Sequence, residues 1–301
     1  MTSWANDRTS GSSDVAGNFL ADLERRVATD RSASPLALRA SLLAEIRRAQ
    51  AAQPSFGLIH QLSARALSVA DTALERGDTL ADLRARLAES CAAERADLAA
   101  SRLAVARTAA ALVAERGVWI ATLSFSTAVR DALLELSRRG LGPRALVAES
   151  RPGLEGRALA AALAGAGLTT WLVVDAALPL LVSQATHVWI GADAVTDRGV
   201  LNKVGSYAIA LAAREHSVPV YALASRRKFL AAATPALAIA EMPTAEVWDQ
   251  PPPGVKPRNV LFEMAPLALF TGVVVEDAVL PPGEAAALAR ERPLPEELGR
   301  I

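Results

Sequence analysis

The chain has 301 residues, 51% of them hydrophobic, and its 32 Lys and Arg balance 32 Asp and Glu to a formal net charge of zero. That balance excludes broad electrostatic binding to nucleic acid, which requires a basic excess. The sequence has no run of about 18 apolar residues, so no membrane span is predicted. The single cysteine, Cys91, excludes an intrachain disulfide and favours a reducing, cytoplasmic compartment.

The first part of the chain carries almost only helical signals. Residues 1–18 are polar and rich in Ser and Gly, and we expect them to be disordered because they lack an apolar core. Leu and Ala then recur at helical spacing in three stretches: residues 20–50 with a break at Ser34-Pro35, residues 58–76, and residues 80–116. These signals predict a helical N-terminal domain over residues 1–116.

The pattern alternates after Gly117. Strands are predicted at residues 118–124, 144–149, 170–174, 187–192 and 218–224, with later ones at 245–248 and 272–275. Helical stretches fill the gaps at residues 127–139, 155–166, 177–184 and 205–215. Strands and helices in this order predict an α/β fold, in which helices cover both faces of a parallel sheet. Residues 117–301 are therefore predicted to form a Rossmann-like domain.

Polar residues stand where the predicted strands end. They are Ser124 and Ser126, Glu149 and Arg151, Asp175, Asp193, then Asn202, Lys203 and Gly205 at the next helix start, and Asn259 near the C-terminus. Ligands of open α/β sheets lie at the carboxyl ends of strands and at helix N-termini. Cations and hydroxyls suit a phosphate, and carboxylates and amides suit sugar hydroxyls. The set predicts a small anionic ligand.

Simpler interpretations apply to single members of this set. The phosphate-binding patterns GxxxxGK[ST] and GxGxxG are both missing from the sequence. An Asp at a strand end is more often a helix cap than a catalytic base, and Arg226-Arg227-Lys228 is more typical of a solvated loop than of a phosphate clamp. His60, His187 and His216 lack metal-ligand spacing, so neither a metal nor another cofactor is predicted.

Residues 191–229, GADAVTDRGVLNKVGSYAIALAAREHSVPVYALASRRKF, resemble a segment of the translation initiation factor 2B alpha/beta/delta family. That superfamily includes methylthioribose-1-phosphate isomerase and ribose-1,5-bisphosphate isomerase. Three further stretches agree: residues 149–156 (ESRPGLEG), residues 53–56 (QPSF) and residues 258–263 (RNVLFE). The resemblance covers roughly residues 35–285.

The resemblance implies a helical N-terminal domain, a Rossmann-like domain with a sugar-phosphate pocket, and dimers or higher assemblies. Asp193 matches the catalytic aspartate of the isomerases, Asn202 and Lys203 match ligand-contacting positions, and Arg151 matches an arginine near phosphate. With Glu149, Ser126, Gly205 and Asn259, these residues complete the expected ligand-binding set. We expect a homodimer formed through the Rossmann-like domain, and no nucleic-acid or membrane partner.

One departure concerns catalysis. Ser124 stands where the isomerases carry a catalytic cysteine, and a hydroxyl is a much poorer nucleophile and proton donor than a thiol unless a base activates it. The N-terminal Arg-Gly-Ala signature of the isomerases is not evident either. The expected function is therefore binding of a sugar phosphate or nucleotide, in a regulatory role and without cysteine-dependent catalysis.

Two alternatives stay open. The first is an active aldose–ketose isomerase, an intramolecular oxidoreductase that uses Asp193 with Ser124 or water. The second is a structural subunit of an assembly like that of initiation factor 2B. Geometry discriminates between them: a shared cavity for Ser124 and Asp193 keeps the isomerase, whereas a cavity filled by Leu123 or Phe125 favours the structural subunit.

Overall fold

The computed structural model describes residues 3–7, 11–232, 234, 237–239 and 241–299. Its N-terminal half is helical: η1 (Ser3–Asn6), α1 (Ser12–Thr29), α2 (Pro35–Ala52), α3 (Gly57–Glu75) and α4 (Leu80–Ala111). The Ser34 hydroxyl caps α2 by accepting from Ala37 N at 3.2 Å, and Pro35 follows at the first helical position. Thr79 and Asp82 form a capping box that starts α4.

The expected disorder of residues 1–18 is wrong where the structure describes that segment. η1 lies over α1, with the Trp4 ring 5.3 Å from that of Phe19 and its Nε1 donating to Asp22. α1 begins at Ser12 and buries Val15 and Ala16 completely. Small and polar residues suggested disorder here, but the apolar face that follows supplies the burial that orders the start of the helix. Residues 1–2 and 8–10 lie outside the described part.

A seven-stranded sheet forms the second half, in the order β10-β9-β7-β4-β1-β2-β3. Its neighbouring strands are parallel except for the β10–β9 pair. The strands are β1 (Trp119–Leu123), β2 (Arg144–Ala148), β3 (Thr169–Val173), β4 (His187–Gly191), β7 (Val220–Leu223), β9 (Gly272–Val274) and β10 (Val279–Leu280). A smaller antiparallel sheet contains β5 (Ala194–Val195), β6 (Gly199–Lys203) and β8 (Phe262–Pro266).

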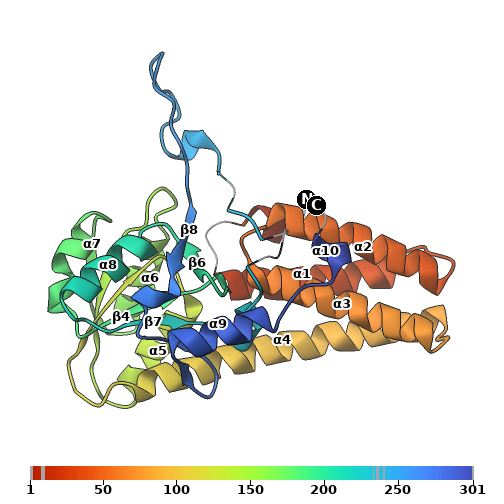
Figure 1. Cartoon of the computed structure of the whole chain (residues 1–301), viewed down its shortest axis with the longest axis horizontal. Coiled ribbons are helices and arrows are strands. Elements are labelled where there is room, and N and C mark those ends of the chain that lie inside the picture. Colours follow the sequence, from red (N-terminus) through yellow and green to blue (C-terminus); the bar gives the residue numbers. More distant parts are fainter. Residues whose placement is uncertain (1–2, 8–10, 233, 235–236, 240, 300–301) are drawn as a thin grey trace.

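Helices cover both faces of the large sheet, which confirms the predicted fold class (Figure 1). One face packs against α4, α5 (Thr127–Arg138) and α6 (Glu155–Gly165). The other packs against α7 (Ala177–Leu181) with η2 (Val182–Gln184), α8 (Ser206–Glu215) and α9 (Pro282–Arg290). The strand predicted at residues 245–248 is wrong: Ala245 and Glu246 belong to η4 (Thr244–Glu246), and Val247 and Trp248 follow it in an exposed extension.

Helix α4 joins the two halves. Its first part, including Leu83 and Leu87, packs in the helical core, and its last part, including Val105 and Ala109, packs beneath the sheet. The chain then returns through α10 (Glu296–Gly299), where Leu298 is buried in the helical core. The predicted domain boundary between residues 116 and 117 stays a prediction. Within the described residues, no helix has the length and apolarity that crossing a membrane requires.

Candidate functional site

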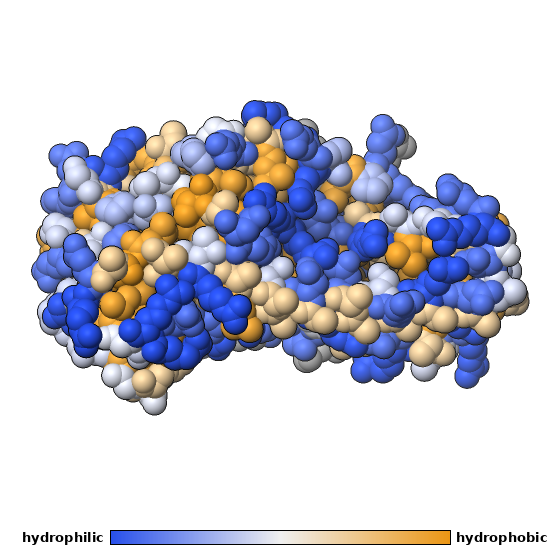
Figure 2. Space-filling view, turned by 90° about the horizontal axis from the view of Figure 1, so that it is seen from below, coloured by the Kyte–Doolittle hydropathy of each residue, from blue (hydrophilic) through white to orange (hydrophobic). Residues whose placement is uncertain are grey.

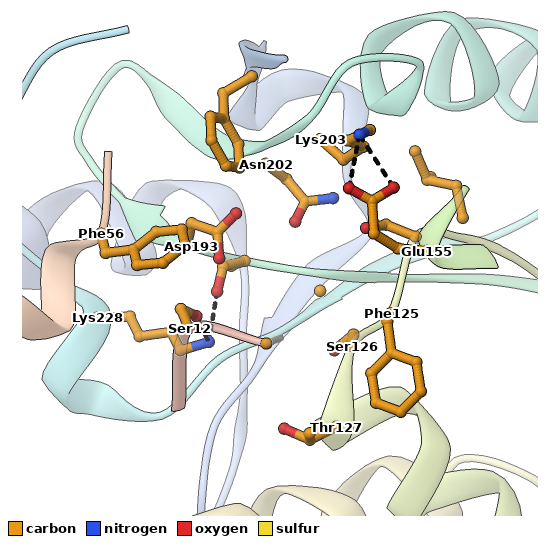
Figure 3. A pocket seen from close by; sticks show the side chains of 16 residues that line it. Ser12, Phe56, Phe125, Ser126, Thr127, Glu155, Asp193, Asn202, Lys203 and Lys228 are labelled. Atoms are coloured by element: carbon orange, nitrogen blue, oxygen red, sulfur yellow. Dashed lines mark hydrogen bonds and ion pairs between the residues drawn. The ribbon is translucent and has the colours of Figure 1, made fainter. Parts of the chain in front are cut away.

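A cavity of about 40 Å³ lies at the carboxyl ends of β1 and β4, where the two halves of the molecule meet (Figure 3). Its volume suffices for a few water molecules. Sixteen residues line it: Gly11, Ser12, Phe56, Leu123, Ser124, Phe125, Ser126, Thr127, Glu155, Gly191, Ala192, Asp193, Asn202, Lys203, Lys228 and Phe262. The lining therefore combines residues from both halves, including the start of the chain that was expected to be disordered.

Four helices begin at this cavity. Ser12 and Glu155 are the first residues of α1 and α6, Phe56 immediately precedes α3, and Ser126-Thr127 start α5. The N-terminus of a helix carries partial positive charge and free N–H groups. Neither α1 nor α3 has a side-chain cap, although Gly57 N is occupied by Asp193 O at 2.9 Å. The converging helix ends favour a negatively charged group in the cavity.

A closed ion pair forms one end of the cavity. Lys203 Nζ lies 2.9 Å from Glu155 Oε1 and 3.0 Å from Glu155 Oε2 (Figure 3). Lys203 is 2% exposed and Glu155 is 6% exposed. Because both oxygens of one carboxylate accept from the same ammonium, the charge of Lys203 is neutralised within the protein.

The other end holds Lys228 and Asp193. Lys228 Nζ is buried and donates to Ser12 Oγ at 3.0 Å and to the carbonyl oxygen of Ala192. Burial raises the pKa of Asp193 above its ordinary value, although the charge of Lys228 opposes this. Burial likewise lowers the pKa of Lys228, although Asp193 opposes this. The hydrogen-bond acceptors of this ammonium are neutral oxygens, so its charge is less completely compensated than that of Lys203.

The start of α8 binds an anion that belongs to the protein itself. Glu263 Oε1, on β8, accepts from Gly205 N at 2.8 Å and from Tyr207 N at 2.7 Å. Gly205 has a φ of 104°, a conformation that suits glycine, and it lies outside the cavity lining. Asn202 lines the cavity; in the orientation that satisfies its neighbours, its amide donates to Gly191 O at 3.2 Å and accepts from Ser206 Oγ at 2.9 Å.

Of the nine predicted site residues, Ser124, Ser126, Asp193, Asn202 and Lys203 line the cavity. Glu149 lies outside the lining and pairs with Arg157 at 2.7 Å. Arg151 is exposed after β2, where its backbone N donates to Asp175. Asn259 is buried away from the cavity and donates to Glu246 Oε2 at 2.7 Å. The contacts of these three side chains with a ligand stay predictions.

Sequence reasoning missed Lys228, because three consecutive cations were interpreted as a solvated loop. In the structure they form η3 (Arg226–Lys228), and each has a different destination. Arg226 pairs with Asp277, and Arg227 pairs with Glu94 and Asp97 on α4. Lys228 enters the cavity. The buried Phe229 that follows was the available signal, since it draws the end of the turn inward.

Ser124 and Asp193 line the same cavity. Ser124 has a φ of 60°, which is uncommon for a residue with a side chain, and its N–H donates to Ser150 Oγ at 2.7 Å. The guanidinium of Arg130 lies 5.8 Å from the centre of the Phe125 ring, and Figure 3 shows that ring turned away from Asp193. Phe125 therefore borders the cavity and leaves its centre unfilled.

Cys91 cannot replace the missing thiol. It is buried on α4, does not line the cavity, and has its pKa raised to about 11 by burial. Across the described part of the chain, no three His, Cys, Asp or Glu side chains are grouped in a way that could hold a metal ion.

The profile of the Initiation factor 2 subunit family matches residues 8–282. A putative translation initiation factor eIF-2B subunit 2-like protein of Pyrococcus furiosus is 35% identical over 172 residues, which span 56% of this chain and 60% of that protein. A ribose 1,5-bisphosphate isomerase of Archaeoglobus fulgidus is 30% identical over 185 residues, which span 58% of each chain. The matched region thus covers about three fifths of these two relatives.

Two solved structures have the same fold. The translation initiation factor eIF-2B of Pyrococcus horikoshii OT3 has a TM-score of 0.78 at 23% identity, with 93% of this chain and 94% of that chain covered. The 5-methylthioribose 1-phosphate isomerase of the same organism has a TM-score of 0.73 at 20% identity, with 94% and 84% covered.

Proposed function

The chain belongs to the Initiation factor 2 subunit family, and from this premise we propose that its cavity binds a sugar phosphate or a nucleotide. The observation that carries the proposal is the convergence of four helix N-termini and the Lys228 ammonium on one small cavity. Such a site supplies N–H groups and positive charge to a phosphate. Asp193 and Asn202 supply a carboxyl and an amide for sugar hydroxyls.

The proposed role is regulatory. Relatives of this chain include proteins named for initiation factor 2B and proteins named for sugar-phosphate isomerases. Ser124 occupies the position at which the resemblance to the isomerases predicts a cysteine. A pocket that keeps its ligand-binding groups without the thiol suits a protein that binds its ligand and leaves it unchanged. The cytoplasm, where Cys91 stays reduced, is the compartment that we expect.

The test is a thermal-shift and calorimetry screen of phosphorylated pentoses and nucleotides, each beside its unphosphorylated counterpart. A ligand at 100 times its dissociation constant stabilises the fold by about 2.7 kcal/mol. We expect stabilisation by phosphorylated compounds only. The cavity of about 40 Å³ is far smaller than the roughly 300–1,000 Å³ typical of ligand sites, so we expect part of the lining to move when a pentose phosphate binds. The absence of binding by every phosphorylated compound would overturn the proposal.

An aldose–ketose isomerase is the second candidate, because Ser124 and Asp193 line one cavity and Phe125 does not fill it. A positioned acid or base contributes about 10²–10⁴-fold to a rate, so the loss of the thiol predicts a wild-type turnover below about 1 s⁻¹ on ribose-1,5-bisphosphate or methylthioribose-1-phosphate. Ser124→Cys is expected to raise turnover on one of them. A wild-type rate of 1 s⁻¹ or more would refute the argument from the thiol.

Self-association belongs to the same proposal. A related structure is described as a tetrameric eIF2B-beta2-delta2 complex from C. thermophilum, at 20% identity to this chain and a TM-score of 0.71. The chain has no net charge to keep its copies apart. We expect a homodimer through the sheet-bearing half, and sedimentation equilibrium at micromolar concentration measures it.

A further inference from the structure

Strand β3 is followed by a carboxylate that lies outside the cavity lining, Asp175. Residues 171–182 read WLVVDAALPLLV, and Asp175 is the one charge in this run. Hydrophobic residues gather on the surface of this sheet-bearing half, while the helical half is mostly hydrophilic on the face that Figure 2 shows. No Lys or Arg side chain pairs with Asp175 in the described part of the chain. An ion pair therefore does not account for a charge in these apolar surroundings.

Asp175 accepts hydrogen bonds from two consecutive backbone N–H groups of the loop between β2 and α6, residues 149–154. Its Oδ1 accepts from Ser150 N at 2.7 Å, and its Oδ2 accepts from Arg151 N at 2.8 Å. Hydrogen bonds to an ionised acceptor at such distances are strong. Because β2 and β3 are paired neighbours, the carboxylate fixes this loop from the edge of the sheet.

The loop in turn holds Ser124, which lines the cavity. The Ser150 side chain is buried, and its hydroxyl accepts from Ser124 N at 2.7 Å while donating to Ala148 O at 3.1 Å. The bond to Ala148 uses the hydroxyl proton, so a lone pair is left to accept from Ser124. No hydrogen bond engages the Ser124 hydroxyl among the described residues. That hydroxyl is therefore free to meet a ligand.

Left-handed backbone conformations gather around these contacts. Ser124, Ser150 and Leu154 have φ values of 60°, 64° and 61°, and they are three of the four non-glycine residues with positive φ in the part of the chain that the structure describes. Such a conformation costs free energy for a residue with a Cβ atom, and it persists only where the surroundings hold it. Asp175 holds the backbone of Ser150, and the Ser150 hydroxyl holds the backbone of Ser124.

We propose that Asp175 is a positioning residue of the ligand site: through Ser150 it sets the backbone of Ser124, and with it the direction of the hydroxyl that meets the ligand. The inference rests on the proposed function for the ligand and on the contacts above for the position. Without the carboxylate, Ser150 leaves its left-handed conformation and releases Ser124 N, so the Ser124 hydroxyl loses its fixed direction. A preorganised hydroxyl favours binding, because less has to be ordered when the ligand arrives.

Amide hydrogen exchange followed by NMR tests the positioning, because it measures single N–H groups. Asp175→Asn keeps the size of the side chain but turns an NH₂ group toward one of the two N–H donors. In this variant we expect exchange at Ser124 N–H to rise at least about tenfold, and exchange at the amides inside β1 to rise less than about threefold. Ser150→Ala is expected to give the same rise at Ser124, while the N–H groups of residues 150 and 151 stay protected by Asp175.

Thr79→Ala is the control for lost stability. It removes the cap of α4 in the helical half, so it lowers stability without touching the loop. We expect it to leave the ratio of Ser124 to β1 exchange as in wild type. Calorimetry with ribose 5-phosphate and with AMP then measures ligand binding. Affinity is expected to fall about tenfold in Asp175→Asn and in Ser150→Ala, the contribution of about one hydrogen bond, and to stay unchanged in Thr79→Ala.

Three results would contradict the role of Asp175. Exchange at Ser124 that keeps the wild-type rate in Asp175→Asn would mean that the carboxylate does not hold Ser124. A rise that β1 shares equally would make Asp175 a structural residue only. Faster exchange at Ser124 with unchanged affinity for a compound that binds wild type would mean that its position does not matter to the ligand. If wild type binds neither compound, the proposed function fails, and the exchange rates still decide whether Asp175 positions Ser124.

Discussion

The two ends of the cavity use the same pair of residue types in different ways. At one end Lys203 and Glu155 are bound to each other through both carboxylate oxygens, and both are buried. At the other end Lys228 donates to a hydroxyl and a carbonyl, with the Asp193 carboxyl beside it. The first end is closed electrostatically and serves the fold. At the second end the hydrogen-bond acceptors of the Lys228 ammonium are neutral oxygens, so we propose this end as the one that binds an incoming anion.

The largest effect on stability is expected from breaking the Lys203–Glu155 ion pair at the first end of the cavity. Glu155→Leu leaves the Lys203 ammonium buried without its carboxylate, which costs about 3–5 kcal/mol of unfolding free energy. Combining it with Lys203→Met restores most of the loss, because apolar groups of similar volume replace the pair. Urea denaturation measures both. If Glu155→Leu lowers the free energy of unfolding by less than about 1 kcal/mol, the Lys203–Glu155 pair is not the stabilising contact that distinguishes this end of the cavity.

The next largest effect is expected on anion affinity, at the end of the cavity that holds Lys228. Lys228→Met is expected to lower affinity for inorganic phosphate or sulfate about 10–100-fold, since a hydrogen bond to a charged group contributes about 1.5–3 kcal/mol. Its cost in stability is expected to stay below that of Glu155→Leu, because Asp193 can take up a proton when the ammonium is gone. Lys256→Met, at an exposed position in the extension that follows η4, is the matched control. Equal anion affinity in Lys228→Met and wild type would show that Lys228 does not contribute to anion binding.

The smallest effect is a dependence on pH. The pKa of Asp193 is raised by burial above its ordinary value of 3.8. Below the raised pKa the carboxyl is neutral and Lys228 attracts an anion; above it the carboxylate opposes binding. The folded state therefore holds this proton more tightly than the unfolded chain. The stability that the protonated Asp193 carboxyl contributes is complete below pH 3.8 and is lost as the pH rises through the raised pKa of Asp193.

Sulfate, which stays a dianion over the accessible range, is the probe for this dependence. Its affinity is expected to fall with rising pH, by about tenfold per pH unit at most. Asp193→Asn should flatten the profile, because the amide has no proton to lose. A profile that is the same in both proteins would assign the dependence to another group.

Periodicity was sufficient to predict six strands of the large sheet and the helices α4 to α8 that cover it, because buried strands must be apolar and the helices between them amphipathic. It did not predict β10, α9 or the three strands of the smaller sheet. It failed at residues 245–248, where Val247 and Trp248 suggested a buried strand but lie in the exposed extension. Apolar character predicts that a side chain will be covered, and it does not say whether its own chain or another one covers it. Ser12 and Lys228 were missed for a related reason. Each enters the cavity through contacts distant in sequence, which no local pattern encodes.

The η3 turn sends three neighbouring cations to three destinations: Arg226 to Asp277, Arg227 to α4, and Lys228 to the cavity. Three residues complete one turn of a 3₁₀-helix, so each side chain leaves in its own direction. An ordinary surface loop tolerates the insertion of a residue, but here a single inserted residue would reassign every direction. The cavity would then face a guanidinium, or no cation at all. For this turn the spacing of the charges is part of the specificity of the site.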